Sequence, residues 1–85
     1  MTPIPDEAFR SVAVPDNTFL RRKESYEYTT ADNIYDIELF ANQDGTYYAI
    51  GMPREGGRLV VYGSRVLPSA HEALQELLDK IHRQA

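Results

Sequence analysis

Cysteine is absent from this chain of 85 residues. Disulfide bonds, thiolate nucleophiles, cysteine-ligated zinc and iron–sulfur clusters are therefore excluded, and nothing points to an oxidising compartment. Long hydrophobic runs are missing too, because the apolar stretch Leu59–Tyr62 is far shorter than the roughly 18 to 20 residues that span a bilayer. The first residues also lack the basic and then apolar order of a signal peptide. These absences predict a soluble, cytoplasmic protein with no membrane partner.

Positive charge is missing from the middle of the chain. The stretch from Glu24 to Ile50 holds six acidic side chains and no lysine or arginine. Basic residues flank it on both sides: Arg21, Arg22, Lys23, Arg54, Arg58 and Arg65. The net charge of −4 repels nucleic acid at long range. Two arrangements fit this pattern: strand faces whose charges balance across a sheet, or an acidic surface that docks a basic partner.

The length and composition predict one small folded domain. A chain of 85 residues excludes a multidomain enzyme, while 42% hydrophobic residues suffice for one core. We expect an N-terminal arm over residues 1–17, where prolines interrupt any regular period, and a single domain over residues 18–85. The arm is either pinned to the domain by Phe9, Val12 and Val14, or it is a tail that orders on a partner.

Alternation of apolar and polar residues predicts strands in the middle of the domain. Strands are expected over residues 19–30, 34–40, 46–52 and 58–63. The second is the clearest, because Tyr35, Ile37 and Leu39 share one face and Asp36 and Glu38 the other. An Asp-Gly pair at residues 44–45 is typical of a tight hairpin, and residues 53–57 form another turn. The strands therefore follow one another as a meander.

A helix is expected at the C-terminal end. Ser69 and Glu72 have the spacing of a capping box, which marks a helix start. One apolar stripe follows at helical spacing: Ala70, Ala73, Leu74, Leu77, Leu78 and Ile81. The predicted fold class is thus α+β, an antiparallel meander of three to four strands with one C-terminal amphipathic helix packed on one face.

Catalytic and metal-binding patterns are weak in this sequence. His71 and His82 stand about 16 Å apart by helical rise, so they cannot share a metal ion. Asp36 and Glu38 have a spacing that suits acid–base work, but a chain this small cannot build a deep cleft around them. The glycines of residues 51–58 lack the Gly-Lys-Ser/Thr ending of a phosphate loop. We therefore expect a protein that is not an enzyme, with no catalytic residue, no metal site and no cofactor.

Tyrosines are more numerous than one core under a single helix needs, so some are expected on the uncovered face of the sheet. They would serve as anchors for another protein or for a second copy of the chain, with charged residues steering the contact. The predicted interaction surface comprises Tyr26, Tyr28, Tyr48, Tyr62, Arg54, Arg58, Arg65, Asp36 and Glu38. The sequence thus predicts a small adaptor or regulatory protein that acts by protein–protein interaction.

One family shares this layout. The runs Tyr35-Asp36-Ile37-Glu38-Leu39 and Asp44-Gly45-Thr46-Tyr47-Tyr48-Ala49-Ile50, then Met52-Pro53 and Ser69-Ala70-His71-Glu72-Ala73-Leu74, resemble HicB-like antitoxin domains over about half of the chain. The resemblance implies an antitoxin role. A second alternative is a regulator that binds RNA or single-stranded nucleic acid, with tyrosines that stack on bases and arginines that contact phosphates.

Overall fold

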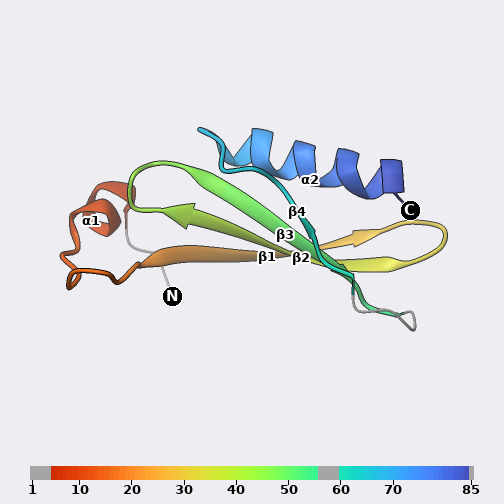
Figure 1. Ribbon diagram of the computed structural model, residues 1–85, viewed down its shortest axis with the longest axis horizontal. Coiled ribbons are helices and arrows are strands. Elements are labelled where there is room, and N and C mark those ends of the chain that lie inside the picture. Colours follow the sequence, from red (N-terminus) through yellow and green to blue (C-terminus); the bar gives the residue numbers. More distant parts are fainter. Residues whose placement is uncertain (1–4, 56–59, 85) are drawn as a thin grey trace.

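The computed structural model describes residues 5–55 and 60–84 (Figure 1). Four antiparallel strands form one sheet: β1 (Arg21–Thr29), β2 (Ile34–Asn42), β3 (Tyr47–Pro53) and β4 (Tyr62–Gly63). Their order in the sheet is β1-β2-β3-β4, so each strand lies beside its neighbour in the sequence. The helix α2 (Ala70–Gln84) packs on one face of this sheet. The predicted α+β meander with one C-terminal helix is confirmed.

The core lies between α2 and the two central strands. Its buried side chains are Tyr35, Ile37, Leu39, Ala49, Ala73, Leu77 and Ile81. Gly51 sits directly beneath the helix, where an added β-carbon would stand 3.4 Å from side-chain atoms of Leu77 and Ile81. The absence of a side chain at this position lets α2 lie close to β3. The apolar stripe predicted for the helix therefore faces the sheet.

Ser69 starts α2 as its spacing predicts. Its hydroxyl oxygen accepts the backbone N–H of Glu72 at 3.2 Å and donates to the Glu72 carboxylate at 3.0 Å. The first turn of a helix has backbone N–H groups without partners inside the helix, and this hydroxyl satisfies one of them.

The turn between β2 and β3 also follows its sequence signal. Gly45 has a φ of 89°, a left-handed conformation that costs glycine little. The carboxylate of Asp44 accepts the backbone N–H of Thr46 at 2.9 Å, and the Asn42 N–H donates to the Thr46 carbonyl at 2.8 Å. These bonds fix the register of β2 and β3, the two central strands of the sheet.

The last strand is shorter than the predicted 58–63. Only Tyr62 and Gly63 form β4, and residues 56–59 lie outside the described part of the chain. Beyond Gly63, the backbone N–H of Ala49 donates to the Ser64 hydroxyl at 2.8 Å instead of to a carbonyl. Pairing with β3 resumes at Leu67, which exchanges two backbone hydrogen bonds with Tyr47. A bulge of this kind interrupts the ladder after Gly63. At the other end, Val60 and Val61, which the prediction placed in the strand, lie outside it.

The N-terminal arm contains a short helix, α1 (Asp6–Ser11). Phe9 is buried, and the guanidinium of Arg22 lies 4.9 Å from its ring centre. The side-chain amide of Gln43 donates to the carbonyl oxygens of Phe9 and Val12 at 3.0 and 2.8 Å. Phe9 therefore holds the arm against the sheet, whereas the side chains of Val12 and Val14 are exposed.

Candidate functional site

The sheet has one face covered by α2 and an opposite one, which we call the open face. Residues directly opposite each other on neighbouring strands point to the same face, so the register assigns each side chain. The open face carries Arg21, Lys23, Ser25, Glu27, Asp36, Glu38, Phe40, Tyr48, Ile50 and Met52.

Four large apolar side chains occupy neighbouring positions of β2 and β3 on the open face. We call Phe40, Tyr48, Ile50 and Met52 the apolar strip. Phe40 and Tyr48 lie opposite each other on β2 and β3, and their rings stack with centres 4.6 Å apart and planes 11° apart. Met52 remains 39% exposed. The strip thus offers adjacent apolar surface on a face that α2 does not cover.

Basic side chains lie over one side of the aromatic stack. The ammonium of Lys23 stands 5.7 Å from the centre of the Phe40 ring, and the guanidinium of Arg21 stands 5.8 Å from that of Tyr48. These are cation–π distances. Lys23 also forms an ion pair with Glu38 at 2.8 Å.

Arg54 joins two carboxylates at the other end of the open face. Its Nη2 atom lies 2.8 Å from Glu27 and 2.5 Å from Asp36, which are directly opposite each other on β1 and β2. Without a cation, these like charges would repel. The hydrogen bonds from Arg54 lower the pKa of Asp36 below its usual value, and the two carboxylates raise the pKa of Arg54.

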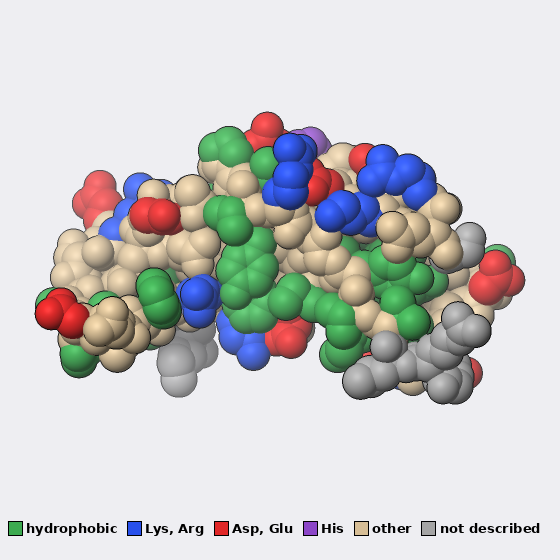
Figure 2. Space-filling model, in the orientation of Figure 1, with side chains coloured by type: hydrophobic (Ala, Val, Ile, Leu, Met, Phe, Trp, Pro, Cys, Tyr) green, Lys and Arg blue, Asp and Glu red, His purple; other side chains and the backbone are tan. Residues whose placement is uncertain are grey.

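Half of the six acidic side chains between Glu24 and Ile50 are paired with cations from outside this stretch. Glu27, Asp36 and Glu38 are all ion-paired, with Arg54 or with Lys23. Acidic and basic side chains are also interspersed over the surface seen in Figure 2. Of the two arrangements that the sequence allowed, the structure shows charges that balance across the sheet.

The four tyrosines of the predicted interaction surface do not share a face. Tyr26 lies opposite Ile37 and Tyr28 opposite Tyr35, so both point to the side of α2. Tyr62 also belongs to that side, and its ring meets the Tyr35 ring edge-on at 6.3 Å. Among these four, Tyr48 alone lies on the open face. That face also carries the predicted Asp36 and Glu38, with Arg54 at the end away from Tyr48.

Tyr28 has a partner that the sequence did not reveal. Its hydroxyl is hydrogen-bonded to Nε2 of His82, and the two rings meet edge-on at 5.7 Å. The exposed His82 thus links the last turn of α2 to β1. No local pattern connects residues 54 positions apart.

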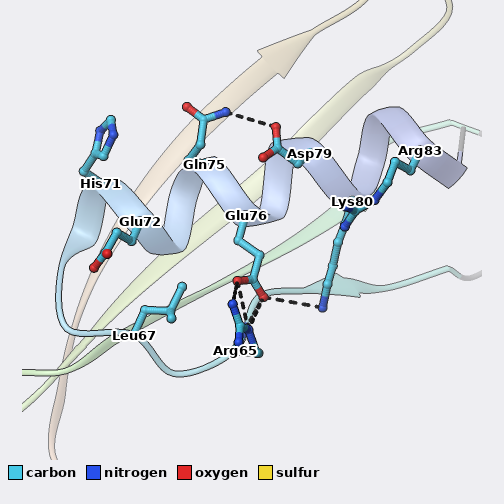
Figure 3. Close-up of a pocket in the computed structure, with 9 residues that line it drawn as sticks. All are labelled: Arg65, Leu67, His71, Glu72, Gln75, Glu76, Asp79, Lys80 and Arg83. Carbon is cyan, nitrogen blue, oxygen red and sulfur yellow. Dashed lines mark hydrogen bonds and ion pairs between the residues drawn. The ribbon is translucent and has the colours of Figure 1, made fainter.

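Arg65 lies away from the open face, in a groove beside α2. Figure 3 shows Arg65, Glu76 and Lys80 joined by ion pairs across this groove of about 570 Å³. Arg65 Nη2 stands 2.8 Å from Glu76, and Lys80 donates to the Gly63 carbonyl at 2.7 Å. The hydrogen bonds from Arg65 lower the pKa of Glu76 to about 2. These charges hold the segment after β4 against the helix.

The remaining predicted site residue, Arg58, lies outside the described residues. Within residues 5–55 and 60–84, no group of three histidine, aspartate or glutamate side chains is placed to hold a metal ion. No helix in the same part of the chain is long and apolar enough to cross a membrane.

Sequence reasoning missed Phe40, Ile50 and Met52 as surface residues. The signal was present, because each alternates with a core residue of its strand, as Phe40 does with Leu39.

Comparison with known proteins gave no further assignment: no protein-family model, no curated protein and no solved structure matches this chain. The likeness to HicB-like antitoxin domains therefore stays a prediction.

Proposed function

We propose that this chain is a small cytoplasmic adaptor or regulatory protein, without enzymatic activity or cofactor, that binds another protein through its open face. The observation that carries the proposal is the apolar strip. Stable protein interfaces combine a central patch rich in aromatic residues and methionine with a polar rim. Phe40, Tyr48, Ile50 and Met52 supply such a centre.

The ion pairs around the strip supply the rim. Lys23 with Glu38 lies at one end, and Arg54 with Glu27 and Asp36 at the other. Each of these five side chains is about half exposed. Partly exposed charges of this kind contribute more to the orientation and rate of binding than to affinity.

The test is a capture experiment from the lysate of the host cell, with and without nuclease. The bait is wild type, the double variant Tyr48→Ala/Met52→Ser, or the control variant Val66→Ser. Val66 is an exposed apolar residue outside the strip, so it matches Met52 in chemistry. Loss of a central aromatic anchor typically costs 2 kcal/mol or more, about thirtyfold in affinity.

We expect wild type and Val66→Ser to retain one stoichiometric protein after nuclease treatment, and the double variant to retain little of it. In the antitoxin interpretation, that protein is a toxin. Equal recovery with all three baits would contradict the use of the open face. Recovery that disappears with nuclease would favour the regulator that binds nucleic acid instead.

A further inference from the structure

The strand β1 leaves one long edge of the sheet unpaired. It has nine residues, and within residues 5–55 and 60–84 only β2 pairs with it. The strand order places β1 and β4 at opposite edges of the sheet. The opposite edge is formed by β4, which has only two residues. Long unpaired edges are templates for pairing with another chain.

The backbone groups that β1 offers can be identified from the ladder. Thr30 donates its N–H to the Asn33 carbonyl at 2.8 Å, and hydrogen-bonded pairs alternate along antiparallel strands. Even-numbered residues of β1 therefore bond to β2. It follows that the N–H and C=O groups of Lys23, Ser25 and Glu27 point outward.

The side chains of β1 are complementary to those of a second, antiparallel copy. With the two strands centred on Ser25, all nine residues overlap, and Lys23 lies opposite Glu27 of the second copy. Because the arrangement is symmetric, Glu27 also lies opposite Lys23 of the second copy. On the other face of the sheet, Glu24 lies opposite Tyr26 of the second copy, and the Tyr26 hydroxyl already donates to a Glu24 carboxylate within one chain.

Neighbouring registers lose this match. A shift that centres the strands on Glu24 pairs Arg21 with Glu27 of the second copy, but it places two glutamates directly opposite each other, which is destabilising, and leaves Tyr28 and Thr29 unpaired. A shift that centres them on Tyr26 places Lys23 opposite Thr29 and removes both charge pairs. Charged residues also protect edge strands from unwanted pairing, but protection alone requires no particular order of signs.

The existing ion pairs extend this pattern across the joined sheet. Lys23 is already paired with Glu38, and Glu27 with Arg54. The signs would therefore alternate from Glu38 to Lys23, and then to Glu27 and Arg54 of the second copy. We propose that the chain forms a symmetric dimer by antiparallel pairing of β1 with β1 of a second copy, centred on Ser25, which joins two sheets into one.

The test is sedimentation equilibrium of the purified protein over a concentration series, with charge-reversed variants. Lys23→Glu and Glu27→Lys each replace two attractive pairs by two repulsive ones, so each should raise the dimer Kd by about tenfold or more. A mixture of the two single variants restores opposite charges in the heterodimer and should associate nearly as well as wild type. The double variant should also recover. Arg83→Glu, on the exposed last turn of α2, is the control reversal.

A backbone variant tests the edge independently of charge. Ser25→Pro removes an outward N–H without removing a hydrogen bond to β2, and should abolish the dimer while circular dichroism stays native. A wild-type protein that is monomeric throughout the series would overturn the proposal, as would a mixture that associates no better than its components. The Tyr48→Ala/Met52→Ser variant should dimerise normally, so this proposal and the proposed function can fail separately.

Discussion

Glu76 shows how one side chain joins two segments of the molecule. Its carboxylate is only 16% exposed and contacts Arg65, which precedes the helix, and Lys80, one turn further along α2. The backbone N–H of Arg65 also donates to this carboxylate at 3.0 Å. Hydrogen bonds to the charged form explain why the pKa of Glu76 is lowered to about 2.

This pKa makes the stability of the fold depend on pH. Because the folded state holds Glu76 ionised down to about pH 2, its contribution is complete above the usual pKa of 4.5 and is lost as the pH falls toward 2. We expect Glu76→Gln to lower the free energy of unfolding at pH 7, and the difference from wild type to shrink between about pH 5 and about pH 2. Urea denaturation at several pH values measures it. A difference that is constant over this range would contradict the contact with Arg65.

Among the elements, α2 is determined most directly by local sequence. The cap at Ser69 and the stripe that includes Ala73, Leu77 and Ile81 can be recognised from this segment of the sequence alone. The same holds for β2, where alternation alone placed Tyr35, Ile37 and Leu39 in the core. These elements were predictable because each pattern repeats with the period of its own backbone.

The contribution of the Ser69 cap to the stability of the fold can be tested by substitution. Ser69→Ala removes the hydroxyl that accepts the Glu72 N–H and should lower the free energy of unfolding by about 1 kcal/mol. Ser69→Asp keeps an acceptor at the same position and should retain most of the stability. Thermal denaturation followed by circular dichroism distinguishes the two. Equal losses for both variants would show that the cap is not what stabilises this end of the helix.

The placement of the tyrosines could not be predicted in the same way. Each strand has two faces, and a shift of one residue in the pairing of β1 with β2 exchanges them. The turn that sets this register depends on Thr30, whose hydroxyl accepts the N–H groups of Asp32 and Asn33. Tyr26 and Tyr28 therefore lie on the side of α2 because this turn sets the register of β1. The alternation of residues within β1 does not reveal that register. The bulge at Ser64, which follows the end of β4, is nonlocal in a similar way, because it depends on the contact with Ala49.

The two faces of the sheet differ across the whole molecule. The face under α2 holds the fold together, whereas the apolar strip adds apolar surface on the open face. Leu77 is fully buried, and Leu77→Ala should lower the free energy of unfolding by about 2 to 5 kcal/mol. Met52→Ser, on the open face, should change it by about 0.5 kcal/mol or less. Urea denaturation of both variants tests this division, and comparable losses would mean that Met52 belongs to the core.

If a protein partner binds the open face, it lies within reach of Met52 in the cell. The most direct test is photo-crosslinking in the host cell, with a photoreactive amino acid placed at position 52 or, as a control, at position 66. Both side chains are exposed, but only the first lies in the apolar strip. We expect one discrete protein adduct from position 52 and none from position 66. The absence of an adduct at position 52, or equal adducts at both positions, would contradict it.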